Sequence, residues 1–294
     1  MTAGNTFLPG CSERHSELRG VRLRWFDGGA GTTLLFLHGF GGAATNWTAV
    51  APALAERFRV IVPDLPGHGC SSALPAPPQR LDPYAERLAL LLERANAAPA
   101  FVVGHSLGGV VALRLALRRP DLVSGLVLAG SAGIGSTTRQ AERMLTLLSL
   151  VQPAKRISRW RRAFARNAFL RRLAFGAVSV ADPRALSPLV ASGFLAGSAL
   201  HTDVRSAGDA LVRDDPRLDL ERVRCPALVL HGARDRQVPL RDGFEYSRRL
   251  RAPLRVIADC GHLLIGERPA AVVDAISNWV RQVEKLPLDA ELVR

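Results

Sequence analysis

Six short, almost wholly apolar runs, each bounded by turn-forming residues, are the feature that most restricts how this chain can fold. Such runs are typical of strands that are buried on both faces of a parallel sheet. They lie at 34–37, 60–62, 101–103, 126–128, 228–230 and 254–257, and residues 21–26 form a further candidate strand. Stretches with helical patterning lie between them, at 47–57, 83–96, 107–119, 241–251 and 269–284. We predict an α/β fold, a mostly parallel sheet flanked by helices.

The alternation of strands and helices is interrupted once, between about residues 131 and 209. This segment is helical in pattern, rich in arginine and without a strand-like run. We predict that it forms an all-helical cap over the carboxyl ends of the strands. The predicted domains are an N-terminal extension at 1–19, a core formed by 20–130 and 210–294, and the cap, or lid, at 131–209.

A G-x-S-x-G pattern, Gly104-His105-Ser106-Leu107-Gly108, lies between the predicted strand 101–103 and the helix 107–119. In this position the pattern is typical of a nucleophile elbow, a turn so sharp that side chains at either end would collide with the strand and the helix. Gly104 and Gly108 meet that steric demand. We predict that Ser106 is a catalytic nucleophile. The alternative is a plain glycine-rich turn.

A glycine-rich loop, His38-Gly39-Phe40-Gly41-Gly42, follows the first buried run. Acyl transfer places negative charge on a carbonyl oxygen, which preorganised backbone N–H groups stabilise. We predict that the amides of Phe40 and Leu107 form this oxyanion hole. His38 is an alternative base, but we predict that it supports the loop through hydrogen bonds, together with Gly39.

Two late strands each lead into a candidate partner for Ser106. Residues 231–239 contain Asp235, and Asp259-Cys260-Gly261-His262 follows the last run. A serine hydroxyl becomes nucleophilic when an imidazole accepts its proton, and a carboxylate stabilises the imidazolium. We predict that His262 is the general base and Asp235 the acid that orients it. Asp259 and His231 are the alternatives, and we predict structural roles for His231 and His105.

The formal net charge of +13 suggests a nucleic acid or an anionic surface as partner. However, only Lys155 and Lys285 among the 39 basic residues are lysines. Such an excess of arginine, with abundant alanine, leucine and glycine, is what codon bias in a GC-rich genome produces. We therefore predict no nucleic-acid partner.

Cysteine usage and hydropathy bear on compartment and cofactors. The four cysteines, Cys11, Cys70, Cys225 and Cys260, are widely spaced and form no C-x-x-C pair, so the sequence indicates neither a zinc site nor a disulfide framework. We predict no metal and no cofactor. Residues 1–17 lack the apolar segment of a secretory signal, and no run approaches the ~18 apolar residues of a membrane span. We expect a cytoplasmic protein.

The cap concentrates positive charge, with eight basic residues between positions 155 and 172. Ile157, Trp160 and Phe164 recur among them at helical spacing. The simpler interpretation is a lid helix that packs this apolar face on the sheet and exposes its arginines. The alternative is that Arg159, Arg162 and Arg166 attract an anionic ligand. Such a ligand would be a carboxylated ester, an acyl group on an acidic carrier protein or an anionic lipid surface.

Taken together, these motifs resemble the α/β-hydrolase superfamily over roughly residues 20–130 and 210–283. The resemblance lies in the oxyanion loop at 37–42 with Asn46-Trp47, the loop at 63–69, the elbow at 104–109, the acid turn at 232–235 and the base at 261–262. It implies an α/β-hydrolase fold with the helical cap inserted after the sixth strand. It also implies a Ser-His-Asp enzyme of the carboxylesterase or lipase kind.

The resemblance implies a serine hydrolase that cleaves a small carboxylic ester or thioester through an acyl-enzyme. Dehalogenases and epoxide hydrolases of this superfamily carry aspartate at the elbow, where this chain has Ser106. Carbon–carbon hydrolases of the meta-cleavage type are an alternative, although they usually have asparagine in place of His105 and tryptophan in place of Leu263. Acyl transfer on the same triad and a non-catalytic binding protein are further alternatives. The sequence predicts no acyl chain, leaving group or oligomeric state.

Overall fold

A computed structural model describes residues 7–135, 157, 160–176 and 179–285. Their strands form one sheet in the order β1-β2-β4-β3-β5-β6-β7-β8. The six central and C-terminal strands are mutually parallel, and β1 and β2 pair antiparallel at one edge. The strand bounds are Ser12–Leu18 (β1), Val21–Gly28 (β2), Thr33–Leu37 (β3), Arg59–Pro63 (β4), Ala100–His105 (β5), Val123–Ala129 (β6), Ala227–Gly232 (β7) and Leu254–Ile257 (β8). The prediction of a mostly parallel sheet is confirmed.

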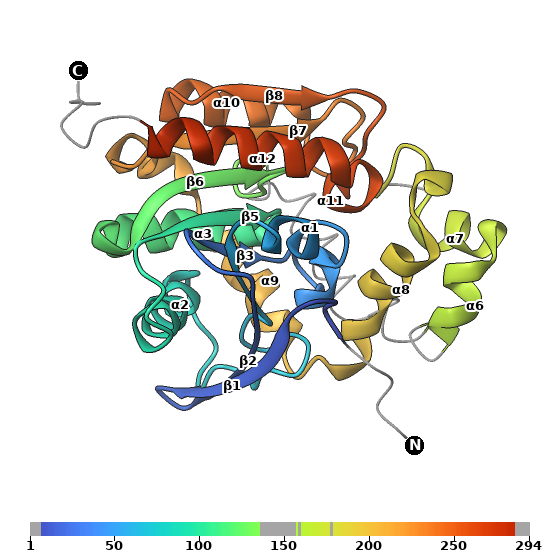
Figure 1. The fold of residues 1–294 in the computed structure, drawn as a ribbon, viewed down its shortest axis with the longest axis horizontal. Helices are drawn as coiled ribbons and strands as arrows, with labels where there is room; N and C mark the ends of the chain where they lie inside the picture. The colour runs from blue at the N-terminus through green and yellow to red at the C-terminus, as the bar shows by residue number, and fades with distance from the viewer. Residues whose placement is uncertain (1–6, 136–156, 158–159, 177–178, 286–294) are drawn as a thin grey trace.

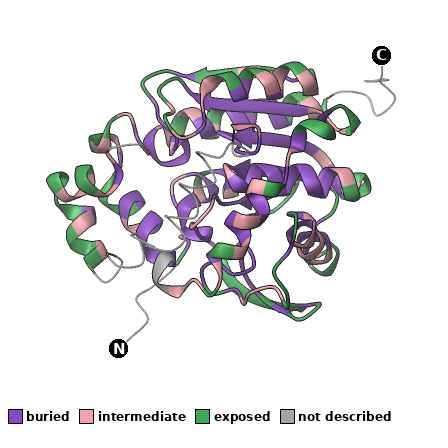
Figure 2. Ribbon diagram, turned by 180° about the vertical axis from the view of Figure 1, so that it is seen from behind, coloured by how far each residue is buried: buried purple, intermediate pink, exposed green. Residues whose placement is uncertain are grey.

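Strand β3 shows why the apolar runs specify this sheet. All five of its residues are buried, and successive side chains enter opposite cores because side chains alternate across a strand. Leu35 and Leu37 pack in one apolar cluster, whereas Leu34 and Phe36 pack in the other. Purple ribbon through the sheet in Figure 2 marks this burial. A strand without a polar face fits only between two helical layers.

Helices cover both faces of the sheet (Figure 1). Side chains of α2 (Asp82–Arg94), α3 (Leu107–Arg118) and α10 (Leu240–Leu250) pack in the cluster with Leu35. Those of α1 (Ala51–Ala55), α11 (Leu264–Glu267) and α12 (Pro269–Glu284) pack in the cluster with Phe36. The helix predicted at 47–57 is divided into a 3₁₀ turn at Ala44–Trp47 and the short α1, which carries Pro52 in its first turn. Proline can begin a helix but cannot continue one.

Strand β1 lies in the segment that we predicted as an N-terminal extension, and the sequence did not suggest it. Its residues pair in register with β2, from Ser12 opposite Asp27 to Leu18 opposite Val21. Only Ser16 and Leu18 of this strand are buried. An edge strand with so little apolar surface has almost no hydrophobic pattern to reveal it.

The cap follows β6, the sixth strand, as predicted. Its described elements are helical: α6 (Arg161–Arg166), α7 (Ala168–Phe175), α8 (Pro188–Ala196) and α9 (Val204–Arg213), with 3₁₀ turns at Pro183–Ala185 and Gly197–Leu200. In Figure 1, α6 and α7 lie far out from the sheet, and α8 lies between them and the core. Helix α8 buries Val190, Phe194 and Leu195 in the cluster that contains Phe36.

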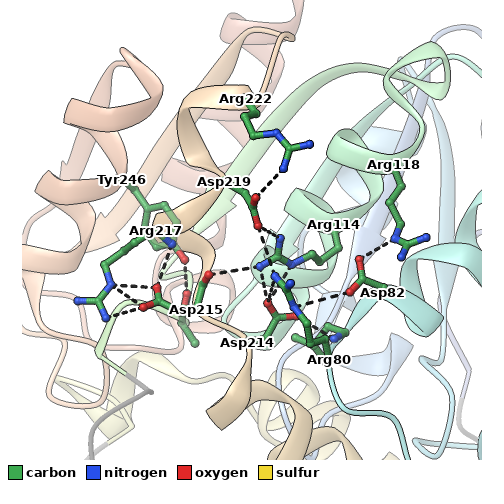
Figure 3. A network of polar contacts seen from close by, with 12 residues as sticks. Arg80, Asp82, Arg114, Arg118, Asp214, Asp215, Arg217, Asp219, Arg222 and Tyr246 are labelled. Carbon is green, nitrogen blue, oxygen red and sulfur yellow. Dashed lines mark hydrogen bonds and ion pairs between the residues drawn. The ribbon is translucent and has the colours of Figure 1, made fainter.

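A network of buried charges holds the chain where the cap returns to the core (Figure 3). Asp214, directly after α9, is fully buried and accepts hydrogen bonds from the Arg114 guanidinium of α3 and from the Leu81 amide. Arg114 also binds Asp219, which in turn accepts from the exposed Arg222. The burial of Asp214 is therefore compensated by a charge that comes from the core.

Replacement of Arg114 by leucine should destabilise the fold strongly, because it leaves the buried Asp214 carboxylate with only the more exposed Arg80, 3.4 Å away, as its charge partner. We expect the free energy of unfolding, measured by urea denaturation, to fall by about 3–5 kcal/mol. Arg222→Leu is the matched control: it removes an exposed partner of the same network and should cost under about 1 kcal/mol. Equal losses in the two variants would contradict this account.

Candidate active site

The Ser106 turn is strained and closely packed. Ser106 stands between β5 and α3 with φ +53° and ψ −117°, a conformation that non-glycine residues rarely adopt. A Cβ atom added at Gly104 would lie 2.3 Å from the Gly108 carbonyl oxygen, and one added at Gly108 would lie 2.4 Å from the Leu37 carbonyl oxygen. Both positions therefore require glycine, and the serine is held at the tip of the turn.

Asp235 and His262 are joined by a hydrogen bond. The His262 Nδ1–H group donates to Asp235 Oδ2 at 2.8 Å, and both side chains are almost fully buried. The other carboxylate oxygen accepts from the amides of Gln237 and Val238. Burial alone would raise the pKa of Asp235, but the charge of His262 and these hydrogen bonds outweigh it and lower that pKa. The carboxylate therefore stays ionised and fixes the imidazole with Nε2 unengaged by Asp235.

The alternative partners have other contacts. Asp259 is 64% exposed and forms an ion pair with Arg234 at 2.6 Å. His231 Nε2 donates to the Val238 carbonyl at 3.0 Å and lies 3.7 Å from Asp235. Asp259 therefore does not replace Asp235, and His231 does not replace His262, in the hydrogen bond that joins Asp235 to His262.

Backbone contacts bring the serine turn and this pair to the same edge of the sheet. Ser106 N–H donates to the Ala129 carbonyl at 3.1 Å. At the next residue, Gly130, an added Cβ would lie 3.5 Å from both Asp235 Oδ2 and His262 Nδ1. His105 Nε2 donates to the His262 carbonyl at 2.9 Å, and burial and the charge of His262 lower the pKa of His105 to about 3. His105 thus ties the two loops together as a neutral ring.

The glycine-rich loop after β3 is held by a buried histidine. His38 Nδ1–H donates to the Gly39 carbonyl at 2.8 Å, and its Nε2 accepts from the Leu65 amide at 2.9 Å. Burial lowers the pKa of His38 to about 4, which keeps the ring neutral so that it can make both contacts. Leu107 is the first residue of α3, and its amide has no acceptor within the helix.

Three residues at this edge were missed as anchors in the sequence analysis. The buried Glu267 carboxylate accepts from the amides of Gly261, Ala181 and Asp182, so it joins the His262 loop to the cap. Asp64 accepts from the amides of Ala44 and Cys70. His201, in the cap, contacts two core loops. A carboxylate within the apolar stretch 263–267 was a usable signal for Glu267, and Asp64 lay in a motif to which we assigned no role.

The outer cap carries the arginines and the apolar side chains that the sequence analysis placed on one helix. Arg162 and Arg166 are exposed on α6, and Arg159 lies outside the described residues. The predicted apolar face is wrong at one position: α6 begins only at Arg161, and Trp160 is 58% exposed, whereas Ile157 and Phe164 are partly buried. On α7, Phe169 and Leu173 are also exposed. The outer cap therefore shows both cationic and apolar side chains to solvent.

Within the ranges that the structure describes, no group of three or more histidine, cysteine or acidic side chains is arranged to hold a metal ion. All four cysteines lie in the described ranges, and none of them forms a disulfide bond there. None of the described helices has the length and apolar character needed to cross a membrane.

Residues 32–269 match a family model described as the alpha/beta hydrolase fold. The chain is 29% identical over 274 residues to the 2-hydroxymuconate semialdehyde hydrolase of Pseudomonas sp. strain CF600, which covers 90% of this chain and 92% of that protein. It is 44% identical over 128 residues to the dihydrolipoyllysine-residue acetyltransferase component of the acetoin cleaving system of Pseudomonas putida. That second match spans 43% of this chain and only 34% of the relative.

Among solved structures, a thermophilic esterase from Thermogutta terrifontis superposes with a TM-score of 0.74 at 27% identity, covering 92% of this chain and 99% of the esterase. The sheet order, the helical cap after β6 and the family match agree with one another. This chain belongs to the α/β-hydrolase fold family.

Proposed function

We propose that this hydrolase cleaves a carboxylic ester or thioester through an acyl-enzyme intermediate, with Ser106 as nucleophile, His262 as general base and Asp235 as the orienting acid. The observation that carries the proposal is the 2.8 Å hydrogen bond between His262 Nδ1 and Asp235, beside the strained Ser106 turn. It favours a neutral imidazole whose Nε2 can accept a proton.

The proposed reaction has two halves with the same proton path. In the first, Ser106 Oγ attacks the carbonyl carbon while its proton passes to His262, and His262 then protonates the departing alcohol or thiol. In the second, a water molecule gives a proton to His262 and attacks the acyl-enzyme, and the proton returns to Ser106. Asp235 remains a carboxylate and stabilises the imidazolium in both halves, consistent with its lowered pKa.

We assign the oxyanion hole to the backbone amides of Phe40 and Leu107. Support comes from the position of Leu107 at the start of α3, where the helix dipole also favours negative charge. Gly104 and Gly108 allow the close approach of strand, helix and β3, while His38 and Gly39 shape the loop that carries Phe40.

Two other reactions use the same residues. The similarity to a 2-hydroxymuconate semialdehyde hydrolase over nine-tenths of the chain favours carbon–carbon bond hydrolysis as the second candidate. Acyl transfer to an alcohol or thiol instead of water is the third. Product analysis separates the three. Ester or thioester hydrolysis releases an alcohol or thiol beside the acid, carbon–carbon hydrolysis releases a product with a new C–H bond, and acyl transfer gives a product that contains the added nucleophile.

We also propose that the cationic outer cap favours anionic substrates or partners. Between Trp160 and Gly176 the chain has five arginines and no acidic residue, and Arg162, Arg166 and Arg172 are exposed. An acyl group on an acidic carrier and an anionic lipid surface are the partners that this charge would fit. A cytoplasmic location remains a prediction from the sequence.

Replacement of Ser106 by alanine should abolish ester hydrolysis. On a panel of p-nitrophenyl esters of varied chain length, we expect kcat to fall by about 10⁴-fold or more, because the covalent intermediate can no longer form. The best wild-type chain length also reports the acyl specificity. A Ser106→Ala protein that keeps its activity would show that the proposed mechanism is wrong.

The two candidate acids are distinguished by a matched pair of variants. Asp235→Asn should lower kcat by about 10³- to 10⁴-fold, because an amide facing Nδ1 no longer fixes the tautomer or stabilises the imidazolium. Asp259→Asn changes an exposed carboxylate and should leave kcat within about twofold of wild type. The reverse order of effects would transfer the acid role to Asp259.

The role of the cap charge is tested by measuring kcat/KM at increasing ionic strength. For a p-nitrophenyl ester with a free carboxylate, kcat/KM should fall about threefold or more as ionic strength rises, while that of a neutral ester stays level. Arg162→Gln/Arg166→Gln should weaken this salt dependence, and Arg57→Gln, which changes an exposed arginine of the core, should preserve it. A rate on the anionic ester that is indifferent to salt would refute the role of the cap charge.

A further inference from the structure

His201 is a cap residue whose imidazole bridges two loops of the core. It lies between the turn Gly197–Leu200 and α9. Its Nδ1 accepts from the Gly69 amide at 3.0 Å, and its Nε2 is 2.8 Å from the Gly41 carbonyl oxygen. Because Nδ1 accepts, the ring proton is on Nε2, which donates to Gly41. The ring thus joins the loop after β4 to the loop that carries Phe40.

The Gly41 carbonyl is the first link of a chain of peptide groups that leads to the Phe40 amide. The peptide that contains the Gly41 carbonyl also contains the Gly42 N–H, which donates to the Gly39 carbonyl at 3.0 Å. The Gly39 carbonyl belongs to the same peptide as the Phe40 N–H. Each carbonyl that accepts a hydrogen bond polarises the N–H of its own peptide, so the donors strengthen one another along the chain.

The position of His201 is fixed by the residues that follow it. The amides of Thr202 and Asp203 both donate to the Gly67 carbonyl at 3.0 Å, and Thr202 Oγ1 donates to the Ser71 carbonyl at 3.2 Å. The approach is so close that a Cβ at Gly67 would lie 2.3 Å from the Asp203 carbonyl oxygen. This clamp sets the backbone from which the imidazole reaches Gly41.

The buried His68 ring packs against His201 and also contacts two other rings. The His68 ring lies 5.4 Å from that of His201 and 5.1 Å from that of His38, and the Phe40 ring meets His68 edge-on. Burial and the charges of the two neighbouring histidines hold the pKa of His68 well below its ordinary value. The row of rings is therefore uncharged at its centre and packs behind the glycine-rich loop.

We propose that His201 is a positioning residue for the oxyanion hole: by holding the Gly41 carbonyl it fixes and polarises the peptide chain that ends at the Phe40 amide. Cap and transition state are thereby linked through one side chain. The proposal rests on the proposed serine-hydrolase function and on Phe40 as an oxyanion donor.

The test compares two substitutions of similar size, His201→Gln and His201→Met. Glutamine retains an N–H donor for Gly41, whereas methionine does not. We expect His201→Met to lower kcat for a p-nitrophenyl ester by about 10- to 100-fold with KM nearly unchanged, since a misplaced oxyanion donor costs part of what a lost one costs. His201→Gln should recover a substantial part of kcat.

Two further measurements separate positioning from general loosening of the cap. Ser187→Ala removes the hydroxyl that caps α8 by accepting from the Val190 amide. It loosens the cap outside the contacts that hold His201, and it should lower Tm while kcat stays within about twofold of wild type. The inhibition constant of a trifluoromethyl ketone, whose adduct carries an oxyanion, should rise across the variants in proportion to the loss of kcat/KM. Active sites are counted with a fluorophosphonate, so that kcat refers to folded protein.

The possible outcomes distinguish failure of the role of His201 from failure of the serine-hydrolase function. Wild-type kcat in His201→Met, equal loss of kcat in His201→Met and Ser187→Ala, or no recovery in His201→Gln would each overturn the role of His201. An active Ser106→Ala protein would instead overturn the serine-hydrolase function itself.

Discussion

The contact between the Ser106 turn and the end of β3 is the steric constraint on which the candidate site depends. At Gly108 the first turn of α3 approaches the Leu37 carbonyl so closely that no side chain fits between them. This approach fixes the direction of α3 relative to the sheet and therefore the direction of the Leu107 amide. It also brings the loop that begins at His38 next to the serine. The strain at Ser106 is sustained by the buried strands on either side.

The histidines at this edge of the sheet differ in their hydrogen-bond partners. His38 and His105 face backbone groups and, in the part of the chain that the structure describes, are buried without a hydrogen-bonded carboxylate, and their lowered pKa values keep them neutral. His262 differs because its Nδ1 faces Asp235. An imidazole that must gain and lose a proton needs a partner that favours the charged form, whereas a ring that supports a loop needs to stay neutral. In the proposed mechanism, histidine thus serves two purposes: proton transfer at His262 and loop support at His38 and His105.

Much of the fold could be predicted because its signals are local. The apolar runs specify buried strands by themselves, and the turn at Ser106 needs only glycines at fixed offsets. Asp235 and His262 could be named because each follows a strand, and strands of a parallel sheet end at one edge. Strand β1 and the 3₁₀ turn before α1 gave weaker local signals. The partners of Glu267 and His201 lie 86 and 160 positions away in the chain, at Ala181 and Gly41, so no pattern of spacing could indicate them.

The three hydrogen bonds to Glu267 have a consequence for the exchange of caps between relatives. One carboxylate serves the Gly261 amide of the core and the Ala181 and Asp182 amides of the cap. In a chimaera whose grafted cap lacks these contacts, the buried Glu267 carboxylate would keep only the Gly261 amide, next to His262, of these three donors. Grafts that join the two parents beyond residue 182 keep the native amides in place, so substrate specificity can be altered without disturbing the proposed base, His262. The useful boundary for recombination in this fold is therefore set by a carboxylate in the core and lies inside the cap.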